Sequence, residues 1–187
     1  MIEKARMLHV HGSKERYYYI DFGYNSRLDT IQAAVLSIKL AQLPKWMEMR
    51  VANGKLYNSL LKEKLEAVGI DVLMSDELNP GGERPDNAVI LPAEPKGLYH
   101  TYNSYEIRVP DRDNVMKALN EKGIGTMIYY PLPLHLQDVF EYLKLGEGDL
   151  PISERIGNDI LALPQYPELG QDSIEYVADT LAGILNK

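Results

Sequence analysis

Residues 28–43 constrain the fold most, because apolar residues occur there around most of a helix. They are Leu28, Ile31, Val35, Leu36, Ile38, Leu40 and Leu43. A helix that is apolar on one side packs against one surface, whereas a helix that is apolar all round is buried on several sides. We therefore expect this helix to need more protein around it than one small domain provides, and to dimerise or aggregate when it is left uncovered.

A second long helix is expected directly after the first. Pro44 suits the first turn of a helix, where its missing N–H costs little. A spacing of three to four residues then continues through Trp46, Met49, Asn53, Tyr57, Leu60 and Leu61. This spacing predicts consecutive helices with a bend at Pro44.

Residues 76–95 interrupt this pattern. Pro, Gly, Glu and Asp dominate the segment, which includes the run Asn79, Pro80, Gly81 and Gly82. Such a composition predicts a surface loop or an irregular connection.

The chain after Tyr99 is expected to form a small α+β domain. Apolar residues alternate with polar ones over residues 102–109, which predicts a half-buried antiparallel strand with Tyr105, Ile107 and Val109 on its apolar face. Asp113 is expected to cap a helix that ends near Gly123.

Further elements are expected towards the C-terminus. A second strand is predicted over residues 126–130, followed by a short helix over 135–143. A helix beginning at Pro151 carries Ile152, Ile156 and Ile160. The last helix begins with Asp172 and Glu175 in the spacing of a capping box.

Composition excludes several classes of function. The net charge of −7 disfavours binding to a nucleic-acid backbone, which requires clustered Lys and Arg. Because the 187 residues include no cysteine, disulfides, zinc–thiolate sites and thiol nucleophiles are excluded. Charged residues come too early for a secretory signal, and no apolar run reaches membrane-spanning length. We therefore expect a cytoplasmic protein with neither nucleic acid nor a membrane as a partner.

Asn25, Ser26 and Arg27 precede the expected helix and form the first candidate site. Two readings of Asn25 and Ser26 are open: they cap the helix, or together with Arg27 they bind a phosphate at its N-terminus. Arg27 also has a simpler interpretation, an ion pair with Asp29 or Asp21.

His135 is the second candidate. It follows Pro131 and Pro133, which restrict the backbone in a way that suits a binding loop, although an ordinary structural histidine remains the alternative. His9 and His11 lack a suitably placed third ligand, so no metal site is expected.

Eight segments in order resemble the motif series of the DegT/DnrJ/EryC1/StrS sugar aminotransferases, in their C-terminal half. The matching segments are residues 3–12, 23–29 with 32–34, 102–105 with 107–108, 111–113, 123–124 with 126, 129–137, 148–151, and 163–164 with 166–169.

This resemblance implies an α/β fold, that of a fold-type-I transferase dependent on pyridoxal phosphate. Such an enzyme has a large cofactor-binding domain, a small C-terminal domain, and two active sites at the interface of a homodimer. The implied division assigns residues 1–43 to a remnant of the large domain with an interface arm, and residues 44–75 to a linking helix. Residues 76–98 form a connection, and residues 99–187 form the small α+β domain.

The resemblance also implies roles for the candidate residues. Asn25 matches the asparagine that reaches across the dimer interface to the cofactor phosphate, with Ser26 and Arg27 beside it. His135, Tyr129 and Tyr102 match positions that border the sugar-nucleotide substrate.

The family's Schiff-base lysine, and the aspartate that binds the pyridine nitrogen, lie upstream of the first residue of this chain. Lys4, Lys14 and Lys39 are the lysines nearest the start, and none stands in the family's lysine motif. We therefore expect no catalytic residue of that kind here, and no transamination by this chain alone.

The resemblance implies that the complete enzyme transfers an amino group, usually from glutamate, to a nucleotide-linked keto sugar for polysaccharide or amino-sugar biosynthesis. Residues 102–105 and 129–131 resemble those of members that act on 3-keto N-acetylated sugars. Three readings of the chain remain open: half of an enzyme that pairs with a separate N-terminal half, a non-catalytic binding or regulatory module, or a remnant.

Overall fold

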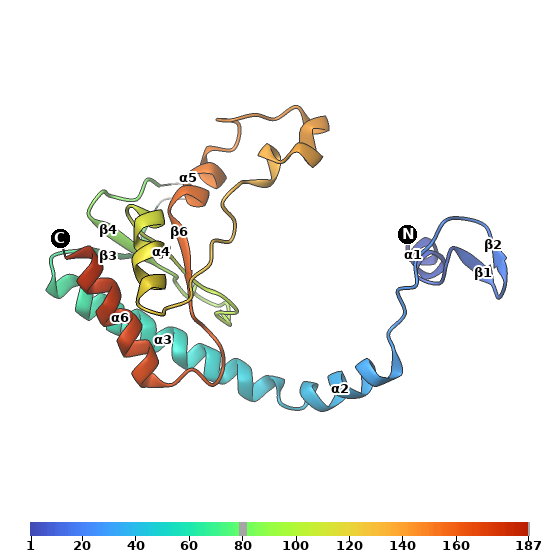
Figure 1. Cartoon of the computed structure of the whole chain (residues 1–187), viewed down its shortest axis with the longest axis horizontal. Coiled ribbons are helices and arrows are strands. Elements are labelled where there is room, and N and C mark those ends of the chain that lie inside the picture. The colour runs from blue at the N-terminus through green and yellow to red at the C-terminus, as the bar shows by residue number, and fades with distance from the viewer. Residues whose placement is uncertain (79–81, 187) are drawn as a thin grey trace. The chain divides into compact units, whose positions relative to one another are not determined.

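The structure, a computed structural model, describes residues 1–78 and 82–186 (Figure 1). It divides into two compact units, Met1–Pro44 and Lys45–Lys187. The run of Asn79, Pro80 and Gly81 predicted as part of a loop lies outside the described residues. None of the helices in the described part of the chain is long and apolar enough to span a membrane.

The first unit contains helix α1 (Ile2–Leu8), a hairpin of β1 (Ser13–Glu15) and β2 (Tyr18–Tyr19), and helix α2 (Thr30–Leu40). Backbone hydrogen bonds join the residues before and after the hairpin, from Tyr24 N to Leu8 O at 2.7 Å and from His11 N to Tyr24 O at 2.9 Å. The hairpin therefore returns the chain to the end of α1 before α2 begins.

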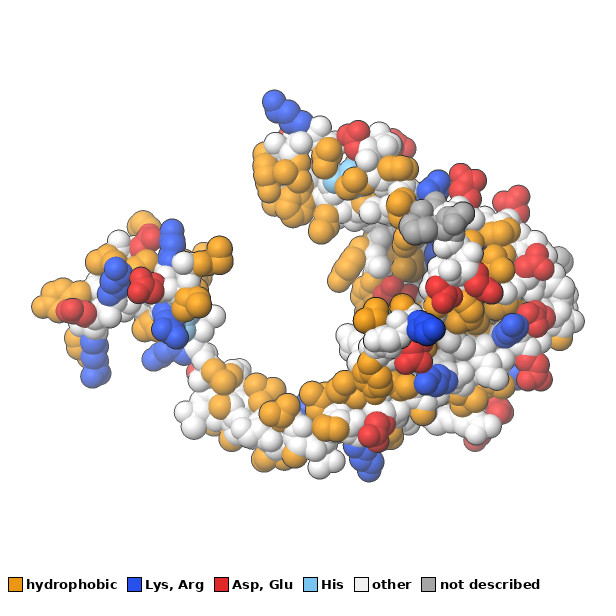
Figure 2. Space-filling model, turned by 180° about the vertical axis from the view of Figure 1, so that it is seen from behind, with side chains coloured by type: hydrophobic (Ala, Val, Ile, Leu, Met, Phe, Trp, Pro, Cys, Tyr) orange, Lys and Arg blue, Asp and Glu red, His pale blue; other side chains and the backbone are white. Residues whose placement is uncertain are grey.

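Helix α2 is the apolar helix expected near residues 28–43, and none of its residues is buried within the unit. Ile31 is 81% exposed and Ile38 is 73% exposed. The orange side chains along the helix in Figure 2 show that its apolar surface is uncovered in this chain. This exposure agrees with the expectation that α2 needs protein beyond its own unit.

The second unit is built on a four-stranded sheet in the order β3-β4-β5-β6. Its strands are β3 (Asp71–Met74), β4 (Ala88–Leu91), β5 (Tyr105–Arg108) and β6 (Ile160–Leu163). Strands β3 and β4 are parallel, whereas β4 with β5 and β5 with β6 are antiparallel. The fold is therefore mixed α/β.

Helices α3 (Leu43–Ala67), α4 (Arg112–Glu121) and α6 (Gln171–Leu185) supply the other half of the core. Their buried residues form one hydrophobic cluster with those of the strands: Tyr57, Leu61, Leu65, Val115, Leu119, Ile174, Val177, Leu181, Val89, Leu91, Tyr105, Ile107, Leu161 and Leu163. Two short 3-10 helices, η1 (Leu134–Leu136) and η2 (Asp138–Leu143), and helix α5 (Pro151–Asp159) complete the unit.

Two tyrosines show how polar groups are accommodated in this core. The rings of Tyr57 and Tyr105 stack with centroids 4.6 Å apart. The Tyr57 hydroxyl donates to Pro164 O at 2.9 Å, and the Tyr105 hydroxyl donates to Asn58 Oδ1 at 2.6 Å. Burial raises the pKa of both tyrosines, so the hydroxyls stay neutral donors.

The alternation predicted over residues 102–109 is confirmed from Tyr105 onwards, in β5, whereas the first two residues reverse it, since Tyr102 is buried and Asn103 is exposed. Tyr105 and Ile107 are fully buried, as is Val109 directly after the strand, whereas Glu106 and Arg108 are only partly buried. Pro44 also lies in the first turn of α3, as expected.

Several predicted elements were wrong. The loop predicted over residues 76–95 contains β4, whose four residues are all buried. Because such a strand is apolar on both faces, it shows no alternation, and the Pro and Gly residues around it dominated the composition. Ile160 begins β6 instead of continuing α5.

The strand predicted over residues 126–130 is reduced to one bridge, Met127 with Ala162. The helix predicted over residues 135–143 is two 3-10 helices, η1 and η2.

The predicted caps were also misplaced. Helix α4 begins at Arg112 with Asp111 as its N-cap residue, and Asp113 accepts from Arg112 Nε at 2.7 Å. Helix α6 follows Gly170 without a side-chain cap. Gly123 does have the left-handed backbone expected after α4, with φ of 77°.

Candidate active site

Asn25, Ser26 and Arg27 lie in an extended segment of the first unit. Asn25 forms a β-bridge with Val10, and Ser26 N donates to His9 O at 3.0 Å. Because this pairing keeps the backbone extended, α2 begins only at Thr30, with Asp29 as its N-cap residue. The prediction that Asn25 and Ser26 cap the helix, or use its first N–H groups, was therefore wrong.

The side chains of Asn25 and Arg27 nevertheless lie together as a pair of donors. Arg27 Nε donates to Asn25 Oδ1 at 3.1 Å, and Asn25, Ser26 and Arg27 are all exposed. Within residues 1–78 and 82–186, no ion pair joins Arg27 to Asp29 or Asp21, so that alternative was wrong. The remaining guanidinium nitrogens and the Asn25 amide are donors suited to a phosphate, whereas the Ser26 side chain projects from the other face of the extended segment.

Two glycines allow the backbone to cross closely before this segment. A Cβ atom added to Gly23 would lie 1.9 Å from Gly12 N, and one added to Gly12 would lie 1.9 Å from Asp21 O. No other residue fits either position without moving the backbone. Gly12 and Gly23 therefore position the donor segment.

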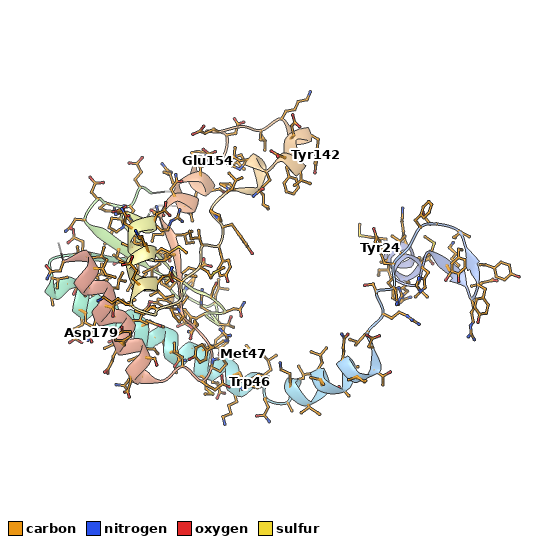
Figure 3. All side chains as sticks on the ribbon, in the orientation of Figure 1. Tyr24, Trp46, Met47, Tyr142, Glu154 and Asp179 are labelled. Carbon is orange, nitrogen blue, oxygen red and sulfur yellow. The ribbon has the colours of Figure 1, made fainter. Side chains whose placement is uncertain are left out.

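His135 lies in η1 of the second unit and is 6% exposed. Its Nε2 atom is 2.9 Å from Glu154 Oε1 on α5. Figure 3 places Glu154 near the base of the segment that carries Tyr142. Sequence reasoning missed Glu154, and the only available signal was its position three residues after Pro151 at the start of a helix.

A cavity of about 550 Å³ lies beside His135. Residues 130–135 and 137 line it on one side, and Leu150, Ser153, Ile156 and Gly157 line it on the other. Tyr129 is not among the lining residues; it is 41% exposed and its ring contacts that of Tyr130. The structure thus brings His135, but not Tyr129, to the cavity wall.

Tyr102 lies in the core of the unit and is 1% exposed, so its predicted place at a substrate rim was wrong. Its backbone has a φ of 45°, and its ring packs directly over Gly54 of α3. The absence of a side chain at Gly54 creates the space that the ring fills.

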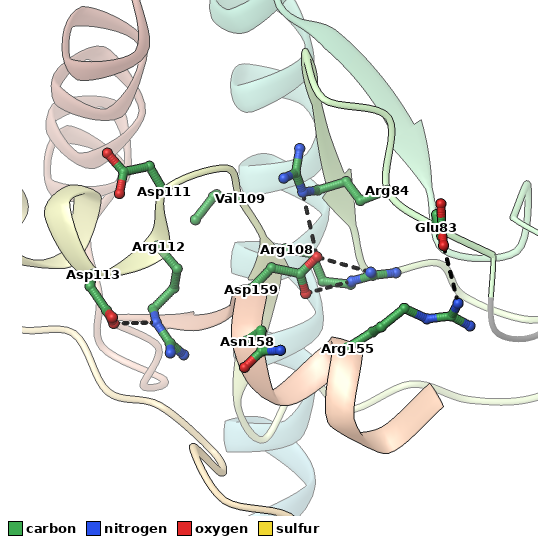
Figure 4. A pocket seen from close by; sticks show the side chains of 10 residues that line it. All are labelled: Glu83, Arg84, Arg108, Val109, Asp111, Arg112, Asp113, Arg155, Asn158 and Asp159. Atoms are coloured by element: carbon green, nitrogen blue, oxygen red, sulfur yellow. Dashed lines mark hydrogen bonds and ion pairs between the residues drawn. The ribbon is translucent and has the colours of Figure 1, made fainter. Parts of the chain in front are cut away.

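A second cavity, of about 440 Å³, is lined by charged side chains (Figure 4). Arg108 donates to both carboxylate oxygens of Asp159 at 2.8 and 2.9 Å, and Arg84 Nε lies 3.4 Å from Asp159 Oδ2. Four arginines, Arg84, Arg108, Arg112 and Arg155, are balanced by Glu83, Asp111, Asp113 and Asp159. The pair of Arg108 and Asp159 joins the end of β5 to the end of α5.

The mixed α/β fold defines the class, since it matches the C-terminal portion of a solved aminotransferase, of which it covers 43%. The model of the DegT/DnrJ/EryC1/StrS aminotransferase family matches residues 1–182. The chain therefore belongs to this family.

Three relatives illustrate the match. The "Pleiotropic regulatory protein" of Geobacillus stearothermophilus is 43% identical over 97% of this chain and 44% of its own length. The "UDP-N-acetyl-3-dehydro-alpha-D-glucosamine 3-aminotranferase" of Acidithiobacillus ferrooxidans is 31% identical over 98% of this chain and 43% of its own. A solved family aminotransferase from Brucella abortus is 32% identical with a TM-score of 0.75, over 99% of this chain and 43% of its own. The chain thus spans less than half the length of these relatives.

Proposed function

We propose that this chain forms the C-terminal portion of an aminotransferase that uses pyridoxal phosphate and acts on a nucleotide-linked keto sugar. Membership of the aminotransferase family supports the reaction class. The observation that carries the proposal is the exposed donor pair of Asn25 and Arg27, on a segment braced against Val10 and His9.

These residues suit the phosphate of the cofactor. In the proposed site the Asn25 amide and the free guanidinium nitrogens of Arg27 donate to the phosphate oxygens. The bond between Arg27 Nε and Asn25 Oδ1 orients both side chains before the phosphate binds. Bound pyridoxal phosphate supplies the group that accepts an amino group from one substrate and donates it to the next.

The lysine that binds the cofactor covalently is proposed to come from outside these 187 residues. None of the lysines here stands in the family's motif, and the chain covers less than half the length of its relatives. A transaminase needs a lysine amine to bond with the cofactor and to move a proton at the substrate carbon. We therefore expect the chain to be inactive by itself.

The proposed partner is a second copy of the chain or a separate N-terminal half. The uncovered apolar surface of α2 supports such a partner, since a helix of this kind needs cover on several sides. In this proposal residues 1–43 belong with the large domain and its interface arm, and the complete assembly works in the cytoplasm.

The proposed substrate is a 3-keto N-acetylated sugar nucleotide, with glutamate as the amino donor. The relative from Acidithiobacillus ferrooxidans carries a name of this kind and is 31% identical to this chain.

The first test treats the purified chain with pyridoxal phosphate and borohydride, followed by mass spectrometry. We expect no stoichiometric lysine adduct. A specific adduct on one lysine would overturn the proposal that the lysine comes from elsewhere.

The second test adds the N-terminal portion of a family relative and follows amino transfer from glutamate to the sugar nucleotide. Activity is expected only in the mixture, and Arg27→Gln is expected to weaken cofactor binding about tenfold or more by removing charged donors. Arg16→Gln is the matched control, because Arg16 is also exposed in the first unit but stacks on Tyr17. Equal effects of the two variants would contradict the phosphate site.

A non-catalytic regulatory module is the second candidate. The relative that is 43% identical to this chain is named "Pleiotropic regulatory protein", and this name supports a regulatory role. The same reconstitution separates the two, since a regulatory module gives no transamination with any N-terminal portion.

A further inference from the structure

The carboxylate of Glu154 is surrounded by hydrogen-bond donors from the loop before its own helix. Gly148 N donates to Oε1 and Oε2 at 3.0 and 2.9 Å, and Leu150 N donates to Oε1 at 3.1 Å. Glu154 lies near the N-terminus of α5, where a negative charge is favourable. The carboxylate therefore holds the loop that leads into α5.

The same carboxylate also binds His135, from a different part of the chain. His135 Nε2 lies 2.9 Å from Glu154 Oε1, and the histidine side chain is only 3% exposed. The backbone hydrogen bond from Gly148 is the largest influence on Glu154 and lowers the pKa of its carboxyl group, so the group is ionised at neutral pH. An ionised carboxylate has no proton to donate.

This contact determines which nitrogen of a neutral His135 carries the proton. Since the carboxylate can only accept, the nitrogen facing it must be the donor, which places the proton on Nε2. In a neutral imidazole the other nitrogen, Nδ1, is then an acceptor. No hydrogen bond to Nδ1 is found within the described part of the chain.

We infer that Glu154 is a positioning residue that holds His135 in the Nε2–H tautomer, with Nδ1 as a hydrogen-bond acceptor for a substrate hydroxyl at the adjoining cavity. His135 lines that cavity together with Leu150 and Ser153, so its ring belongs to the cavity wall. The substrate part of this inference rests on the proposed function, whereas the tautomer does not.

Glu154 couples two parts of the cavity wall through one group. Its Oε1 atom accepts from Gly148 N and Leu150 N and faces His135 Nε2, while Oε2 accepts from Gly148 N. Removing the carboxylate is therefore expected to release both the ring and the loop. The neutral isostere glutamine is expected to keep its oxygen at the Oε1 position, where the donors meet, and so to keep both contacts.

The test is a long-range ¹H–¹⁵N spectrum of the full chain labelled on histidine, at a pH where the ring is neutral. Resonances of His135 are identified by their loss in His135→Gln. We expect the pattern of the Nε2–H tautomer in the wild-type chain. Glu154→Ala is expected to raise the population of Nδ1–H, because no acceptor then faces Nε2, whereas Glu154→Gln is expected to retain Nε2–H because its oxygen stays where the loop N–H groups meet. Glu141→Gln, on the exposed surface of η2, is the matched control and should change nothing.

The wild-type spectrum decides the inference even if the variant does not fold. A predominant Nδ1–H tautomer in the wild-type chain would overturn it, as would an unchanged tautomer population in folded Glu154→Ala.

In the reconstituted enzyme, Glu154→Ala is expected to lower kcat/KM for the sugar nucleotide about tenfold, as the loss of one oriented hydrogen bond implies, without changing that for glutamate. An equal loss for both substrates would refute the positioning role towards the sugar. If the tautomer is as expected but no amino transfer is restored, the proposed function fails and the link between Glu154 and His135 stands.

Discussion

The contact between Gly54 and Tyr102 predicts whether a single added carbon atom, the Cβ of an alanine at position 54, stabilises or destabilises the protein. A Cβ atom added to Gly54 would lie 2.5, 2.6 and 2.9 Å from Cγ, Cδ2 and Cδ1 of Tyr102. These ring atoms are close to the backbone of Tyr102, and the residue is 1% exposed. The ring therefore cannot move aside without shifting the backbone or the surrounding core.

We expect Gly54→Ala to lower the free energy of unfolding by about 2 kcal/mol. Alanine is favoured over glycine inside a helix by about 1 kcal/mol. Inserting a methyl group into a packed core costs about 1–3 kcal/mol, and the upper value applies to a contact with ring atoms that cannot yield. A net loss of this size lowers the Tm of a domain of this length by roughly 4–8 °C.

Gly183→Ala is the matched control. Gly183 lies in α6, is exposed, and has no atom within 4 Å of an added Cβ. This substitution is therefore expected to raise stability by up to about 1 kcal/mol through helix propensity alone. Urea unfolding followed by circular dichroism measures both variants on the same chain.

A double-mutant cycle isolates the contact. When Tyr102→Ala has removed the ring, Gly54→Ala is expected to stabilise the remaining protein instead of destabilising it. If Gly54→Ala is neutral or stabilising while Tyr102 is intact, the packing argument is refuted.

Three further predictions concern charge and surface. Asp159→Asn is expected to cost about 3 kcal/mol of unfolding free energy, because it leaves a mostly buried guanidinium without its ionised partner. Lys55→Ala, which removes an exposed pair, should cost under about 1 kcal/mol, and equal costs in urea unfolding would contradict this. The hydrogen bond from Gly148 lowers the pKa of Glu154 in the folded chain. The ionised Glu154 therefore contributes fully to stability above the ordinary glutamate pKa of about 4.3, and this contribution is lost as the pH falls through the lower pKa of the folded state. Glu154→Gln should therefore flatten the decline of the urea midpoint in that acid range, and an unchanged decline would count against the carboxylate. Ile38→Glu should reduce self-association in sedimentation without changing the circular dichroism of the chain, because α2 buries nothing within its unit; unaltered association would exclude this helix as the contact surface.

Much of the second unit could be predicted from periodicity. The alternation around Tyr105 and Ile107 predicted β5 and its buried face, because successive side chains of a strand point to opposite faces of the sheet. Pro44 marked the start of α3 for an equally local reason. The family was also recognisable from ordered motifs, and its model matches residues 1–182.

Strands without such a pattern could not be placed. Strand β4 is buried on both faces, so it has no alternation, and its place in the sheet depends on pairing with β3 and β5. The start of strand β6 was predicted as part of the preceding helix because Ile160 continues the apolar spacing of that helix. In the structure the helix ends at Asp159.

The amino-acid sequence by itself determined the family, the period of the main elements, and the donor types at Asn25, Ser26 and Arg27. Only the tertiary structure decided where those side chains are used. In the folded chain Asn25 pairs with Val10, the Tyr102 ring packs over Gly54, and Glu154 contacts His135. The physical reason is that periodicity and capping are local properties of the chain, whereas a pair 19 residues apart is set by how separate elements pack.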